Sequence, residues 1–183
     1  AVKARSEGFG NRRMYHVFPN ALYLEGVLQT GEFAAASMAG LVSSVPPQQG
    51  LTNIELNGFD DIPAVYRTYN REELNTMASG GTLILMQDQA GGRIYIRHQV
   101  STAAVDGNLL TTELSITKNL DAISYYFAGV LEPFYGKYNI TPELLAVIRT
   151  QIDSGLNFLG SDQVASGLLG AMLILENGYT KIK

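Results

Sequence analysis

The chain of 183 residues contains no cysteine, so disulfide bonds and thiolate metal sites are both excluded. Histidine is nearly absent as well. A multi-histidine metal centre would need both His16 and His98, and the HExxH spacing of zinc proteases does not occur. No apolar run reaches the roughly 18–20 residues that a membrane-spanning helix needs. The longest run, 164–175, is interrupted by a serine and two glycines.

Charge is also scarce. Charged residues make up 16% of the chain and hydrophobic residues 46%, which is typical of a folded globular protein. With so few charges, we expect much of the surface to be covered by partners. The net charge of −4 argues against a general nucleic-acid-binding protein, since such proteins present basic stripes. The length predicts one domain or two small ones. The sequence starts at Ala1 without a methionine or a visible signal peptide, so we expect a fragment or a processed product.

The first half of the chain predicts a sheet covered by helices. Residues 14–18 are apolar on both faces, as in a central strand. Residues 31–45 are rich in alanine and predict a closely packed helix that ends at Pro46-Pro47. A loop then continues to the turn at Asn57-Gly58.

A strand–helix–strand unit is expected next. Residues 62–66 predict a short strand, and residues 82–86 form a strongly β run. Between these two segments, Asn70 begins a helix with Glu73 three residues on, which is an asparagine version of the capping box.

The segment 117–159 predicts two amphipathic helices joined by a polar elbow. Pro133 and Gly136 end the first helix, and Thr141 caps the second, with Pro142 at its first position. The expected buried stripes are Leu120, Ile123, Phe127, Val130, Leu131 and Phe134 in the first helix and Leu145, Ile148, Ile152, Leu156 and Leu159 in the second.

The last residues predict a hairpin. Strands at 172–175 and 179–182 flank a turn at Asn177-Gly178. The whole pattern predicts a mixed α/β (α+β) fold, with a mixed sheet and flanking helices followed by a smaller subdomain of strands and two helices.

No motif for catalysis or phosphate binding occurs in the sequence. Gly80-Gly81 and Gly91-Gly92 lack the GxxxxGK[ST] and GxGxxG patterns and are typical of turns. Gly136-Lys137 follows a helix instead of preceding one, so it belongs to the elbow. No GxSxG pattern appears either. We therefore predict no catalytic residue, no metal ligand and no cofactor.

Three groups of residues keep alternatives open. His16 or the Asp60-Asp61 turn could serve a small enzyme, although a core histidine and turn carboxylates are the expected interpretation. Residues 93–100 alternate as a strand. Its basic cluster of Arg93, Tyr95, Arg97 and His98 could line a nucleic-acid groove, meet an acidic partner or face solvent. The aromatic residues near the elbow suit both core packing and an interface, since aromatic side chains are enriched at interface centres; they are Tyr125, Tyr126, Phe127, Tyr135 and Tyr138.

Three pieces of the sequence, in this order, resemble the contractile tail sheath proteins of myovirus-type phages and related contractile injection systems. Residues 12–19 (RRMYHVFP) resemble the family's strand of the form RRxYxVYP, which precedes a small-residue helix. Residues 52–58 (TNIELNG) resemble its TNxxLNG loop. Residues 97–102, 116–121 and 135–141 resemble its arginine-bearing strand, its helix beginning near an aspartate and its FxGKxN elbow. The resemblance covers roughly residues 12–175.

The resemblance implies a structural subunit without enzymatic activity. In that family, six subunits form a ring, rings stack helically around an inner tube, and contraction drives the tube through the target cell envelope. It implies that residues 1–95 are part of the main sheath domain, with its N-terminal portion missing. Residues 96–183 would be an inner-type domain without a complete C-terminal arm.

The implied partners are other copies of the chain and the inner tail tube protein, with no direct nucleic-acid contact and no membrane insertion. The implied location is the tail of the virion, assembled in the bacterial host cytoplasm. Candidate contact residues are Lys137, Asn139, Glu143 and Arg149 toward the tube, and Tyr179 and Lys181 on a last strand that could begin a β-augmentation between subunits.

Two other hypotheses remain from the sequence. One is a small α/β enzyme or nucleotide-binding module, which a pocket of convergent polar groups would favour. The other is an oligomeric binding domain without motion. For the sheath hypothesis, an extended assembly would relax to a contracted one through rearranged subunit contacts.

Overall fold

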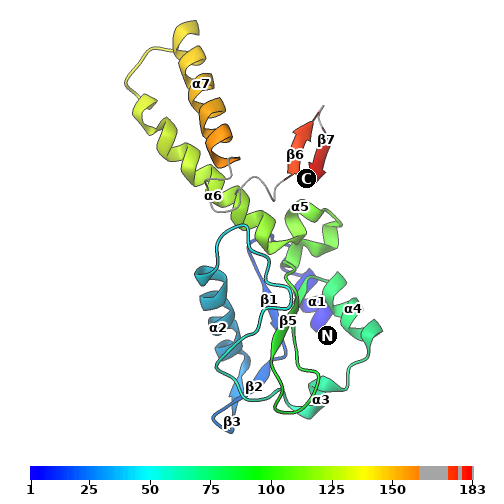
Figure 1. Ribbon diagram of the computed structural model, residues 1–183. Helices are drawn as coiled ribbons and strands as arrows, with labels where there is room; N and C mark the ends of the chain where they lie inside the picture. Colours follow the sequence, from blue (N-terminus) through cyan, green and yellow to red (C-terminus); the bar gives the residue numbers. More distant parts are fainter. Residues whose placement is uncertain (161–172, 177–178, 183) are drawn as a thin grey trace. The chain divides into compact units, whose positions relative to one another are not determined.

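The computed structural model describes residues 1–160, 173–176 and 179–182. It divides into two compact units, Ala1–Thr117 and Lys118–Lys183 (Figure 1). The first unit contains a mixed sheet with helices on both faces, and the second contains two long helices and a pair of strands. The predicted mixed α/β class is confirmed.

The sheet of the first unit has the strand order β1-β4-β5, with β1 at His16–Phe18, β4 at Thr82–Met86 and β5 at Tyr95–His98. Strand β1 pairs with β4 in parallel, and β5 pairs with β4 in antiparallel. The central strand is therefore β4, whereas residues 14–18 were predicted to be central. Strand β1 is an edge strand among those described, and it looks central in the sequence because helices cover both of its faces.

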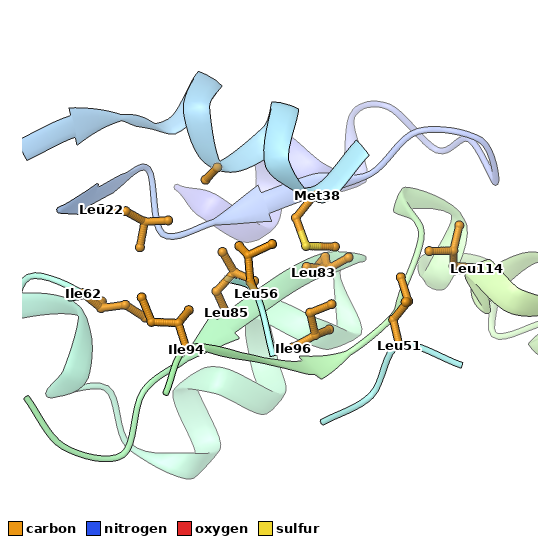
Figure 2. Packing of buried hydrophobic residues seen from close by; sticks show 11 residues of the cluster. Leu22, Met38, Leu51, Leu56, Ile62, Leu83, Leu85, Ile94, Ile96 and Leu114 are labelled. Atoms are coloured by element: carbon orange, nitrogen blue, oxygen red, sulfur yellow. The ribbon is translucent and has the colours of Figure 1, made fainter. Parts of the chain in front are cut away.

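One face of the sheet packs against helix α2 (Gly31–Ser44). Met38 and Ala34 of this helix are buried, together with Leu83 and Leu85 of β4. Figure 2 shows these apolar side chains gathered between the helix and the sheet. Their cluster contains Leu22, Ala34, Met38, Leu51, Leu56, Ile62, Leu83, Leu85, Ile94, Ile96 and Leu114.

The opposite face of the sheet packs against α1 (Val2–Glu7) and α4 (Arg71–Ser79). Ile84 of β4 points to this side because successive strand residues alternate between the two faces. It clusters with Phe18, Leu74 and Met77. The predicted capping box of α4 is present, with the Asn70 side chain accepting a hydrogen bond from the backbone N–H of Glu73.

A β-hairpin follows the sheet's first strand. Its strands are β2 (Ala21–Leu24) and β3 (Val27–Thr30), paired in antiparallel. The two turn residues, Glu25 and Gly26, have φ values of 50° and 76°. Two successive positive φ values are the mark of a type I′ turn, whose twist matches that of the flanking strands.

The loop 51–62 covers the outer edge of β5. The backbone N–H of Asn53 donates to the carbonyl of Ile96, and that of Leu56 donates to the carbonyl of Ile94. Two buried glutamines fasten its ends: Gln99 Oε1 accepts from the N–H of Leu51 at 2.7 Å, and Gln87 Oε1 accepts from the N–H of Ile62 at 2.8 Å. The loop therefore seals an edge that would otherwise be open to pairing.

The strand predicted at 62–66 is wrong. That segment runs through Pro63 into a single helical turn, α3 (Ala64–Arg67). Proline cannot donate to a strand ladder, and its fixed φ suits the start of a helix. After β5 the chain forms η1 (Thr102–Asp106) and α5 (Leu109–Thr112).

The second unit consists mainly of a helical hairpin. Helix α6 (Leu114–Leu131) is followed by η2 (Glu132–Phe134), an elbow and α7 (Pro142–Leu159). Figure 1 shows α7 running back along α6. Thr141 caps α7 as predicted, because its Oγ1 accepts from the N–H of Leu144 at 3.2 Å. Strands β6 (Leu173–Glu176) and β7 (Tyr179–Ile182) pair in antiparallel. The predicted Asn177-Gly178 turn lies outside the described residues.

The two compact units divide at Thr117/Lys118, whereas the sequence-based division lies at 95/96. Strand β5 begins at Tyr95 and pairs with β4, so residues just after 95 belong to the sheet of the first unit. The assignment of 1–95 and 96–183 to the two domains of a sheath subunit stays a prediction.

Candidate functional site

The described part of the chain holds no group of three or more histidine, aspartate or glutamate side chains that could bind a metal ion. Among the same residues, no helix is long and apolar enough to span a membrane. Much of the apolar run at 164–175 lies outside the described residues.

The residues of the enzyme hypothesis are placed apart and each is engaged by its surroundings. His16 lines a hollow of 240 Å³ with Arg5 and Asn20, and Asp60 and Asp61 do not line it. His16 Nδ1 lies 3.5 Å from Thr82 Oγ1, and burial, aided by the nearby Arg5 charge, lowers its pKa below 6.5.

Both carboxylates of the Asp60-Asp61 turn hold loops together. Asp60 Oδ2 accepts from the N–H of Gly26 at 2.9 Å. Asp61 Oδ1 lies 2.5 Å from Arg67 Nη1 and accepts from the N–H of Gly91 at 3.3 Å. Asp60 is exposed and Asp61 is half-buried, and each carboxylate is held by backbone or guanidinium donors. These contacts agree with the structural interpretation of the turn.

The basic face of β5 is largely satisfied within the fold. The Arg93 guanidinium lies 4.9 Å from the ring centre of Tyr95. The Tyr95 hydroxyl donates to Asp88 at 2.8 Å, and Arg97 donates to Asn75. Burial, together with this hydrogen bond, raises the pKa of Tyr95 above 10.0. Both arginines therefore have partners within the fold, and this face is not an open row of cations.

His98 is exposed, although the alternation of β5 would place it on the same face as the buried Ile94 and Ile96. It forms an ion pair that the sequence did not indicate. The register shifts between Ile84 and Leu85 opposite it, and His98 Nε2 lies 2.6 Å from Glu113 Oε1. The Glu113 carboxylate raises the pKa of His98 above 6.5, against the opposing effects of burial and Arg97. Because Glu113 directly precedes α6, the pair links the end of β5 to the start of the long helix.

The helical hairpin carries the main unassigned surface. Where its helices meet, Gly155 of α7 admits the rings of Tyr126 and Phe127, and Phe158 stacks on Tyr126 at 6.2 Å between ring centres. Many large apolar side chains of the hairpin are nevertheless exposed, from 41% for Leu156 to 86% for Tyr125. They are Tyr125, Tyr135, Tyr138, Ile140, Leu145, Val147, Leu156 and Phe158.

Part of the predicted α7 stripe is wrong. Leu145 and Leu156 are exposed, while Leu144, Ile148 and Ile152 are half-buried and Gly155 and Leu159 are buried. The face turned toward α6 is therefore rotated by about 40° from the predicted stripe, and it includes Gly155, where the rings of α6 come closest. Exposed apolar side chains in such number indicate a surface that packs against a partner.

The predicted contact residues fall in two places. Lys137 and Asn139 lie exposed in the elbow, and Glu143 lies in the first turn of α7. Hydrogen bonds from its own backbone N–H and from Thr141 lower the pKa of Glu143. Arg149 is exposed farther along α7. Tyr179 and Lys181 lie in β7, opposite Glu176 and Ile174 of β6.

No protein-family model matches the chain, but its fold matches solved structures. The sheath tail protein of Desulfitobacterium hafniense is similar with a TM-score of 0.69 and 14% identity over 93% of this chain and 38% of that one. The sheath tail protein of Listeria innocua has a TM-score of 0.62 and 15% identity over 85% of this chain and 40% of that one. A chain of the anti-feeding prophage baseplate has a TM-score of 0.63 and 15% identity over 82% of this chain and 40% of that one.

These matches define the class of fold. It is the fold of solved sheath tail proteins, and the resemblance stated from the sequence motifs is confirmed at the level of the fold. The chain spans about two fifths of the length of each of these structures.

One curated protein also aligns with the chain. It is the small ribosomal subunit biogenesis GTPase RsgA of Saccharophagus degradans, 24% identical over 156 residues, which are 83% of this chain and 45% of that protein. The chain thus spans less than half the length of this relative. The GxxxxGK[ST] motif that cradles nucleotide phosphates is absent from the whole sequence.

Proposed function

We propose that the chain is part of the structural subunit of a contractile tail sheath. The observation that carries the proposal is the fold match to a sheath tail protein over 93% of the chain. The ordered sequence motifs and the exposed apolar hairpin support it. In this function the chain has no catalytic role, and it resides in a phage tail or a related injection device.

The mechanism proposed is mechanical. The first unit has apolar clusters on both faces of its sheet, so it moves as a solid block. Subunits form hexameric rings that stack around an inner tube, and contraction exchanges one set of subunit contacts for another. Tightly packed blocks suit this task because interfaces between them switch between discrete arrangements.

The contact residues are proposed on the second unit. Lys137, Asn139 and Glu143 at the elbow, together with Arg149, form the candidate surface toward the tube or a neighbouring subunit. In β7, Tyr179 and Lys181 belong to a strand that pairs on one side with β6. Its other edge is a candidate for β-augmentation by a neighbouring subunit.

Electron microscopy of the full-length parent protein tests this proposal. Negatively stained preparations are expected to contain tubes with a helical surface lattice, formed without added nucleotide. Monodisperse particles, together with a rise in melting temperature on addition of GTP and Mg²⁺, would instead support the nucleotide-binding alternative that the GTPase relative suggests.

A further inference from the structure

The outer face of α7 has a pattern that complements itself. At about 100° per residue, Leu145, Arg149, Asp153 and Leu156 fall within one arc of the helix, beside the side that faces α6. All four are exposed, Leu145 by 55% and Leu156 by 41%. Within the described residues, no ion pair involves Arg149 or Asp153. Along the arc, one leucine therefore lies before and one after two opposite charges that form no ion pair within the described residues.

We propose that this arc binds the same arc of a second copy of the chain, with the two α7 helices antiparallel. In a two-fold arrangement about residue 151, Arg149 of each copy lies level with Asp153 of the other. Leu145 lies within one residue, or about 1.5 Å of helical rise, of the partner's Leu156. Both charges and both leucines are thereby matched by a single rotation, which is the requirement for an isologous contact.

The order of the charges favours a partner copy over pairing within one helix. An acidic residue four positions before a basic one supports an isolated helix best, and here the basic residue comes first. The antiparallel arrangement instead places opposite charges directly across the contact, where they set register and orientation.

The size of the contact predicts a weak dimer. A stable interface buries roughly 1,200–2,000 Å² in total, and one pair of helices of 18 residues provides less. Dimerisation is therefore expected to depend on concentration, and the contact suits a reversible association of free subunits. This inference rests on the pattern of α7 and does not require the proposed sheath function, although it assigns Arg149 to a contact between subunits.

Sedimentation velocity of the 183-residue chain over a concentration series tests the inference. The wild type is expected to convert from monomer to dimer as concentration rises. The variants Arg149→Asp and Asp153→Arg each place like charges opposite one another and are expected to weaken the dimer at least tenfold. The double variant Arg149→Asp/Asp153→Arg restores opposite charges and is expected to restore the dimer.

Ser154→Arg is the matched control. Ser154 is exposed on α7 and lies about 140° round the helix from Arg149, so an added charge there leaves the dimer unchanged. Circular dichroism of each variant confirms that α7 remains folded. A wild type that stays monomeric at all concentrations, or a self-association that the double variant fails to restore, overturns the inference. Sheath tubes formed by a chain with no such dimer would overturn this contact alone and leave the proposed function standing.

Discussion

At the scale of single residues, a comparison of two glycines with positive φ distinguishes the cost of backbone strain from the cost of steric overlap. Gly81 has φ of 84°, and an added Cβ would lie 2.5 Å from the carbonyl oxygen of Ser101 and 2.7 Å from Thr102 Cα. Gly91 has φ of 68° and no atom within 4 Å of such a Cβ. The two positions share the conformational penalty and differ in the space around them.

We therefore predict unequal costs for the two alanine variants. Gly91→Ala is expected to lower the free energy of unfolding by about 1 kcal/mol, the penalty of a left-handed conformation. Gly81→Ala is expected to cost about 3 kcal/mol or more, because backbone atoms must also move. Urea denaturation measures both values. Equal losses for the two variants would show that the contact with residues 101–102 is looser than described.

The two histidines predict opposite responses of stability to pH. The folded-state pKa of His98 is raised above 6.5 by Glu113. Its stabilising contribution is fully present below pH 6.5 and is lost as the pH rises through the folded-state value. The folded-state pKa of His16 is lowered below 6.5, so its protonation destabilises the fold as the pH falls from 6.5 toward the lowered value.

Thermal unfolding of His98→Gln and His16→Gln across pH 5 to 9 checks both signs. In His98→Gln, the melting temperature is expected to lose its decline toward alkaline pH. In His16→Gln, it is expected to lose its decline toward acidic pH. The effect at His98 is expected to be modest because 47% of its side chain is exposed and solvent screens the pair. A His98→Gln profile that parallels the wild type above pH 6.5 would contradict the assigned role of Glu113.

At the scale of elements, the helical hairpin depends on one close approach. A Cβ at Gly155 would lie 2.9 Å from Phe127 Cε1 and 3.0 Å from Tyr126 Cε1, whereas one at Gly129 of α6 would meet no atom within 4 Å. Both glycines are in helices. Alanine favours a helix over glycine by about 1 kcal/mol at either position, so the two positions differ chiefly in packing.

We predict that Gly129→Ala stabilises the chain by about 1 kcal/mol. Gly155→Ala is expected to be less stable than Gly129→Ala by about 1–3 kcal/mol, the usual cost of overpacking, because the aromatic rings of α6 must shift. Chemical denaturation followed by circular dichroism gives the difference. An equal gain at both positions would mean that α6 and α7 do not pack through Gly155.

The element scale also shows what the sequence could predict. Helix starts at Asn70 and Thr141 were predicted because their caps are local, fixed by residues three positions apart. The strand at 62–66 failed because Pro63 was given too little weight against an apolar run. Leu145 was wrongly predicted to lie on the buried side of α7. Apolar residues occupy a wide arc of this helix, and the position of the neighbouring helix decides which part of the arc is buried. The pairing of His98 with Glu113 joins residues with no local relation, so no pattern in the sequence indicates it.

At the scale of the whole molecule, most of the described apolar side chains that are buried lie in the first unit, although that unit also exposes some, such as Val27 and Leu28. In the first, Leu83, Leu85 and Ile96 are each at most 3% exposed. In the second, large side chains on both α6 and α7 stay open, as with Tyr125 and Leu145. Few buried apolar contacts mean low local stability, so the hairpin is expected to gain stability from a partner.

Hydrogen exchange measures this difference directly. Amides of β4 and β5 are expected to exchange slowly, near the limit of global unfolding, and those of α7 much faster. On assembly into a polymer, protection is expected to rise mainly in α6, the elbow and α7. Exchange that is equally slow in α7 and β4 of the free chain would contradict the expectation that the hairpin needs a partner to reach full stability.

The proposed function requires a sheath that contracts. Cryo-electron microscopy of particles containing the parent protein, before and after contraction is triggered, tests it most directly. We expect residues 1–117 to fit both helical maps as one unchanged block, with new contacts made at the hairpin and at the edge of β7. Maps with no density for this fold in the layer around the inner tube would contradict the proposed function. So would a lattice that is the same before and after the trigger.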